Sequence, residues 1–207
     1  MTMNYSRVLL TTGVALLAFA ACKKDSDSDA TTASTVTATT VNNLNGDTLV
    51  TGHYTFFRLK DAAVVPLSDS ASAKWDIGFR ATNIIVNGGS SGPGAGATFF
   101  YTGLFSDLTT IPDSSFKQDA GATLALASWY TYTGTTTVPN HAILPVPGKV
   151  IVIRTADNKY AKLEIISYYK DNPNTSTSTF ADLSTRPASR YFTFRYVYQA
   201  DGSKKLN

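Results

Sequence analysis

The chain has 207 residues and a net charge of +3, with 12% aromatic and 16% charged residues. Lysines and arginines are scattered along it without a dense basic block, which argues against a nucleic-acid-binding protein. Glu164 is the only glutamate, whereas Thr, Val, Ile and Tyr are abundant, so the composition indicates a β-rich domain.

The N-terminus has the features of a secretory signal that ends at a lipid-attachment site. Arg7 precedes an apolar run over residues 8–21, which as a helix would reach about 20 Å, short of the ~30 Å hydrocarbon core of a membrane. The run ends in the letters LAFAAC, which resemble a bacterial lipobox, although Phe19 stands where leucine is usual. We therefore predict a signal peptide over residues 1–21 and Cys22 as the acylated first residue of the mature chain.

Two alternatives to acylation are a plain signal peptide that ends near a cysteine and a buried core cysteine. Cys22 is the only cysteine in the chain, so it has no disulfide partner, and an unpaired thiol is unexpected in an exported protein. Residues 22–46 are rich in Ser, Thr, Ala and Asp, and such a segment buries too little apolar surface to offset its ordering entropy. We predict a flexible tether over residues 22–46 and one domain over residues 47–207.

The folded part alternates polar and apolar residues with a period of two in several windows. Gly, Pro, Asn and Asp separate these windows. Thr155 to Asn158 are turn residues between two such windows, and this pattern strongly predicts a β-hairpin. The predicted strands are residues 53–59, 75–80, 98–102, 128–133, 150–154, 159–169 and 191–198. Helical turns are predicted only within residues 70–74 and 122–127. We predict a single all-β domain of antiparallel strands and hairpins.

The alternation also predicts which side chains share a face of the sheet. In the hairpin strand over residues 159–169, Leu163 and Ile165 share one face, and Lys162 and Glu164 lie on the other. The strand over residues 150–154 is β-branched throughout, so we expect it to be buried on both faces.

The sequence contains little evidence for a catalytic or a nucleotide-binding motif. The glycine-dense residues 87–96 lack the Gly-Lys-Ser/Thr of a phosphate loop and lead into a strand, so they are predicted to be a plain loop. No Gly-x-Ser-x-Gly elbow is present, and only His53 and His141 could act as a catalytic imidazole. We expect a protein that is not an enzyme.

Several segments together resemble the HmuY family of Bacteroidetes surface lipoproteins. They are the letters WDIGFR, NIIVNGGSSG, WYTY, HAILP, IVIRTADNKYAKLEIISYY and YFTFRYVYQ, which occur in this order over roughly residues 50–200. The resemblance implies an all-β domain that is lipid-anchored at the outer membrane, exposed at the cell surface, and active in haem and iron acquisition. It also implies three partners: haem or a related tetrapyrrole, an outer-membrane haem receptor, and the bilayer through Cys22.

In haem-binding members of the family, two axial side chains hold the iron between β-hairpins, either a pair of histidines or a pair of methionines. Both methionines of this chain, Met1 and Met3, lie in the predicted signal peptide, so the mature chain has no thioether ligand. His141 stands where the second ligand of the family falls, and we expect it to be the metal ligand. His53 starts the first strand and does not fit the pattern.

The other ligand should lie within residues 108–116, where the sequence has neither His nor Met. A tyrosine could substitute, since phenolates ligate haem iron in other proteins, and Tyr130 and Tyr132 are the candidates beside Tyr101. Aromatic side chains in strands more often pack in the core. A second hypothesis is therefore a binding module of the same fold that has lost haem ligation and recognises another ligand or surface partner.

Overall fold

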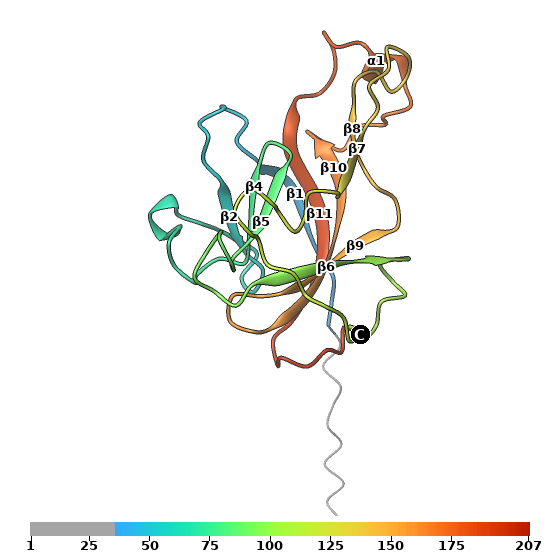
Figure 1. Ribbon diagram of the computed structural model, residues 1–207. Helices are drawn as coiled ribbons and strands as arrows, with labels where there is room; N and C mark the ends of the chain where they lie inside the picture. Colours follow the sequence, from blue (N-terminus) through green and yellow to red (C-terminus); the bar gives the residue numbers. More distant parts are fainter. Residues whose placement is uncertain (1–35) are drawn as a thin grey trace, which may run out of the picture. The chain divides into compact units, whose positions relative to one another are not determined.

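The computed structural model describes residues 36–207, so the predicted signal peptide and Cys22 lie outside the described residues. Residues 36–207 form one compact unit (Figure 1). It contains a five-stranded antiparallel sheet of order β1-β11-β10-β9-β6, a four-stranded sheet of order β3-β2-β4-β5, and the two-stranded hairpin β7-β8. The strands are β1 (Thr39–Asn45), β2 (Thr55–Arg58), β3 (Ala63–Val65), β4 (Ile77–Arg80), β5 (Asn83–Val86), β6 (Ala97–Thr102), β7 (Tyr130–Tyr132), β8 (Ile143–Pro145), β9 (Lys149–Arg154), β10 (Tyr160–Tyr169) and β11 (Ser189–Gln199).

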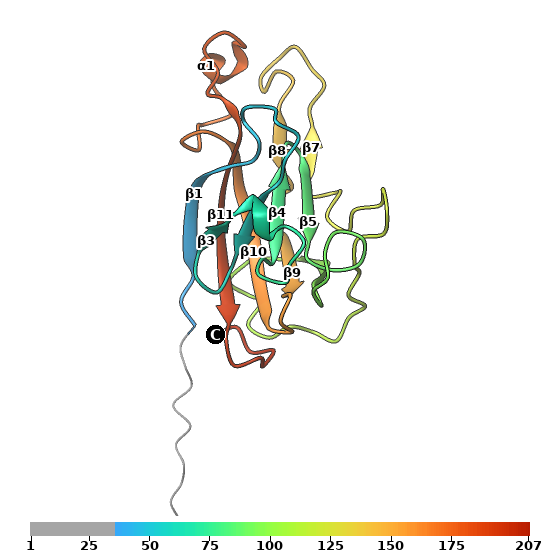
Figure 2. The ribbon, with the colours of Figure 1, turned by 90° about the vertical axis from the view of Figure 1, so that its left-hand side faces the viewer.

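Helix is confined to two short pieces of the described chain. They are the 3-10 turn η1 (Leu67–Asp69) and α1 (Ser178–Ala181). Within residues 36–207 no helix has the length and apolar character needed to cross a membrane. Both ribbon views place α1 at one end of the domain and the C-terminus at the other (Figure 2).

The main core lies between the five-stranded and the four-stranded sheet. Phe57 and Phe79 from the smaller sheet meet Phe194 from the larger one, with ring centroids 5.5 and 5.4 Å from that of Phe194. Ile151 and Ile153 of β9 join this core, because alternate residues of a strand point to the same face.

The opposite face of the large sheet, on which Lys162 lies as predicted, is also covered. Residues 104–111 and Leu206 lie over it and form a second apolar cluster with Val150 and Val152. Lys162 is consequently only 4% exposed, and its Nζ donates 2.8 Å hydrogen bonds to the carbonyls of Phe105 and Leu108. The burial of β9 on both faces is confirmed by the same packing.

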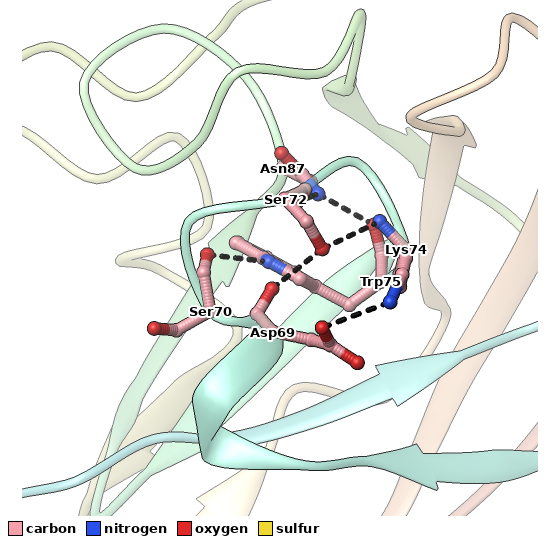
Figure 3. Close-up of polar contacts among 6 residues, drawn as sticks. All are labelled: Asp69, Ser70, Ser72, Lys74, Trp75 and Asn87. Carbon is pink, nitrogen blue, oxygen red and sulfur yellow. Dashed lines mark hydrogen bonds and ion pairs between the residues drawn. The ribbon is translucent and has the colours of Figure 1, made fainter.

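A third cluster lies on the outer face of the small sheet, around Trp75, and Figure 3 shows the polar contacts that hold it. The Trp75 indole donates to the Ser70 carbonyl at 2.9 Å. The Asn87 amide donates to the carbonyls of Ser72 and Trp75 at 2.9 and 2.8 Å. These contacts tie the turn after η1 to the start of the glycine-rich segment.

The glycine-rich residues 87–96 form the loop between β5 and β6, as predicted. The loop folds back on itself, so a Cβ at Gly88 would lie 1.9 Å from the carbonyl oxygen of Gly96. Gly94 donates to the Asn87 side chain at 3.0 Å, and Asn87 is completely buried. The glycines therefore serve close backbone packing.

The all-β fold and every predicted strand are confirmed, and two other expectations need correction. Strand β1 lies within residues 22–46, for which the sequence predicts a tether, so the sheet begins earlier in the chain than predicted. The Asn-rich β1 breaks the alternation, because its register with β11 shifts between Val41 and Leu44 and Asn43 has a φ of +56°. Residues 122–127 contain turns and no helix, and the α-helix of the described chain is α1 instead.

Candidate functional site

The β7–β8 hairpin carries His141 and Tyr132 at its tip. In the hairpin Tyr132 pairs with Ile143, and residues 133–142 form the connecting loop. The Thr133 hydroxyl donates to the Pro139 carbonyl at 2.7 Å and accepts from the Ala142 amide at 2.8 Å, which closes the loop at its base. His141 has a φ of +43°, a conformation in which histidine is enriched, and its amide donates to the Thr135 carbonyl at 2.9 Å.

This loop geometry brings the Tyr132 hydroxyl to within 2.6 Å of Nδ1 of His141. The two rings are stacked, with centroids 5.8 Å apart and planes inclined by 28°. Both side chains are exposed, Tyr132 to 57%. His141 is exposed, and its Nε2 makes no hydrogen bond within residues 36–207.

Arg186, from the segment between α1 and β11, fastens the hairpin tip. Its guanidinium donates to three backbone carbonyls, those of Phe180 at 2.8 Å, His141 at 3.2 Å, and Asn140. The guanidinium also lies 4.5 Å from the ring centroid of Phe180. The Asn140 side chain adds a 2.9 Å hydrogen bond to the Ala181 carbonyl. The backbone that carries His141 is therefore held by the α1 segment.

A cavity of about 390 Å³ lies between the hairpin tip and this segment. His141, several apolar residues, and the cationic residues Arg186 and Arg190 line this cavity. A second cavity, of about 600 Å³, borders the first and shares Ile143, Tyr168 and Tyr169 with it. The second cavity is lined chiefly by residues of β8 and β10 and contains no imidazole.

Two tyrosines in the shared wall are fixed by their surroundings. Burial raises the pKa of the Tyr168 phenol to about 12, although Arg190 opposes the shift. The Tyr169 hydroxyl accepts a 3.0 Å hydrogen bond from the Ile143 amide, and its ring packs edge-on against Phe180. Both residues thus belong to the wall of the cavity.

Of the residues selected from the sequence, the structure brings Tyr132 and His141 together. The ring of Tyr130 packs against Trp129 at 4.9 Å and borders the main core, as strand aromatics commonly do. His53 lies in the exposed segment before β2. No set of three or more His, Cys, Asp or Glu side chains suited to a metal ion occurs in the part of the chain that the structure describes.

The segment expected to supply a second haem ligand, residues 108–116, does not line the cavity next to His141. Leu108 and Ile111 are buried with Leu206, and the Ile111 amide donates to the Lys204 carbonyl at 2.8 Å. Residues 108–111 are therefore packed beside the C-terminus, at the end of the domain opposite to α1. Our expectation that this segment faces His141 is not met.

Sequence reasoning did not identify Arg186 and Asn140. Both lie in irregular segments, and no spacing rule marks an arginine that bonds to carbonyls 45 and 46 residues earlier in the chain. The residues Pro139-Asn140-His141 and the pair Arg186-Pro187 each predict a loop. They do not predict that the two loops contact each other.

Comparisons with known proteins agree with the observed fold. The sequence model described as "HmuY protein" matches residues 51–181. No curated protein is significantly similar to the chain.

Three solved structures are similar in fold. The apo HmuY analogue of Tannerella forsythia has a TM-score of 0.50 and 15% identity, over 79% of this chain and 95% of the other. A Bacteroides fragilis protein described as a lipoprotein has a TM-score of 0.51 and 16% identity, over 78% and 90%. Apo PinO from Porphyromonas gingivitis has a TM-score of 0.51 and 12% identity, over 79% and 96%. At sequence identities this low, the similarity shows a shared fold alone.

Proposed function

The chain belongs to the HmuY family, and from that premise we propose that it is a non-catalytic surface lipoprotein that binds haem at the tip of the β7–β8 hairpin. Cys22 would carry the lipid, since two or three acyl chains anchor a protein firmly where one chain binds only marginally. The anchored domain would face outward from the outer membrane and deliver haem to an outer-membrane receptor.

The observation that carries this proposal is the exposed His141 ring with Nδ1 engaged and Nε2 available. An imidazole binds iron through an unprotonated nitrogen, and the hydrogen bond at its other nitrogen selects that tautomer. The Tyr132 hydroxyl lies 2.6 Å from Nδ1 and is able to accept the proton that Nδ1 carries in that tautomer. A haem iron already has four ring nitrogens, so a single axial imidazole is enough to hold it.

The surroundings of His141 suit the rest of a haem molecule. Its ring system is flat and apolar, and Ile143, Leu183 and the rings of the shared wall offer apolar contacts along the cavity of about 390 Å³. Its two propionates are anionic, and Arg186 and Arg190 place positive charge in the same wall. Haem itself would supply the iron and its four equatorial ligands.

The test is a titration with hemin. The protein used is residues 23–207, a fragment that retains the whole compact unit. We expect a saturable shift of the Soret band, and at least tenfold weaker binding in the variant His141→Ala. His53→Ala is the matched control and should bind as the parent does. A flat titration, or equal losses in both variants, would refute the proposal.

A second candidate function is a binding module of the same fold for another apolar ligand. Two observations favour it: residues 108–111 lie away from His141, and the larger cavity of about 600 Å³ has no imidazole. Binding of other apolar molecules to a chain that ignores hemin, with loss of binding in Ile166→Asp in the wall of that cavity, would support this candidate.

A further inference from the structure

The structure places one side chain, and not two, in position to ligate haem iron. On the basis of the function proposed above, we infer that this chain ligates the iron from one side only, through Nε2 of His141 with Tyr132 as its positioning residue, and leaves the opposite axial position open to a small exogenous ligand. Imidazole and cyanide are ligands of this kind.

The side chains that could supply a second axial ligand are few. Proteins ligate haem iron with His, Met, Cys or Tyr, and residues 36–207 contain two histidines, no methionine and no cysteine. His53 lies in the segment before β2, outside the walls of both cavities next to the hairpin. Only tyrosines of the cavity wall remain.

Neither wall tyrosine is available to the iron. Tyr168 is 4% exposed, and its ring packs against Phe192 and Trp129 at centroid distances of 5.3 and 5.9 Å. Tyr169 is 3% exposed, with its hydroxyl bonded to the Ile143 amide. Moving either hydroxyl onto an iron atom would open the main core.

Tyr132 cannot serve as an opposite ligand either, because it stands on the same side as His141. Its hydroxyl lies 2.6 Å from Nδ1, and the two rings are stacked. When Nε2 binds a metal, Nδ1 carries the proton and donates it to the Tyr132 oxygen. Tyr132 therefore orients the imidazole, and its hydroxyl oxygen can accept the Nδ1 proton of the tautomer that binds through Nε2.

The experiment is spectroscopic and uses residues 23–207 loaded with ferric hemin. With one axial imidazole from the protein we expect a high-spin absorption and paramagnetic-resonance spectrum. Added imidazole or cyanide should convert it to low-spin in a saturable way, with the hemin still bound. A low-spin resting spectrum that neither ligand changes would overturn the inference and leave the proposed function standing. Absence of saturable hemin binding would overturn both.

The role of Tyr132 is tested with Tyr132→Phe, which keeps the ring and removes the hydroxyl. Loss of a partner behind a metal-bound imidazole typically weakens metal affinity by about 10–100-fold. The loss should appear with hemin and not with metal-free protoporphyrin, which has no iron to ligate. Tyr130→Phe, two residues earlier on β7 and without a bond to His141, is the control. Equal weakening for both porphyrins, or none for hemin, would overturn the positioning role.

Discussion

Arg186 should contribute more to stability than any exposed ion pair of this domain, because it joins three carbonyls across two segments. The substitution Arg186→Met keeps an apolar stem over Phe180 and removes the guanidinium. A hydrogen bond from a charged donor contributes roughly 1.5–3 kcal/mol when buried. Arg186 is only partly buried, so we discount the three bonds by about half and expect a loss of about 2–4 kcal/mol.

For a domain of this size, 1 kcal/mol corresponds to roughly 2–4 °C in Tm, so Arg186→Met should lower Tm by about 4–16 °C. Thermal unfolding followed by circular dichroism measures this. The matched control is Arg58→Met, which breaks one exposed pair with Asp61 at 2.7 Å and should cost less than about 1 kcal/mol.

Hydrogen exchange provides a second measurement at the site itself. The His141 amide, which donates to the Thr135 carbonyl at 2.9 Å, should exchange faster in Arg186→Met than in Arg58→Met. If the two variants have the same Tm and the same exchange at this amide, the α1 segment does not hold the hairpin tip, and our account of how His141 is positioned is wrong.

Two further predictions concern buried polar groups. Asn87→Ala removes two donated hydrogen bonds and one accepted from Gly94, so urea unfolding should show a loss of about 3 kcal/mol, and a loss below about 1 kcal/mol would contradict the contacts of Figure 3. Burial lowers the pKa of Lys162 from 10.5, and Arg195 makes a smaller contribution in the same direction. Between the lowered pKa and 10.5 the unfolded chain therefore binds more protons than the folded chain. The free energy of unfolding should consequently rise with pH in that window. Comparison with Lys162→Met by urea unfolding from neutral pH to pH 10.5 isolates this rise, and parallel curves for the two proteins would refute it.

The residues of the candidate site differ in how far the sequence could reveal them. His141 could be selected because it is one of two imidazoles and stands in a segment that resembles the family. The choice between Tyr132, Tyr130 and Tyr101 required the structure, since all three occupy strands of similar composition. Tyr132 reaches His141 because the loop over residues 133–142 reverses the chain direction. The reversal brings the Tyr132 hydroxyl within 2.6 Å of Nδ1 of His141.

Local sequence patterns were sufficient to predict seven of the eleven strands in residues 36–207 and the faces that meet in the main core. Leu163 and Ile165 are buried on the expected face because the two-residue period of a strand is a property of the backbone. The same rule could not predict the burial of Lys162. Its cover comes from residues 104–111, more than fifty positions earlier in the chain, and periodicity carries no information on such long-range packing.

By itself, then, the sequence determined an all-β domain of the HmuY family, and it predicted a lipid anchor and His141 as a haem ligand. Only the tertiary structure decided that β1 completes the large sheet, that residues 108–111 pack away from His141, and that Arg186 holds the hairpin tip. The physical reason is that strand patterns follow from each residue's immediate neighbours, whereas a ligand site depends on where loops distant in sequence come to rest. The site that we propose would offer haem one imidazole on one side, and the hemin titration with its two histidine variants tests this proposal directly.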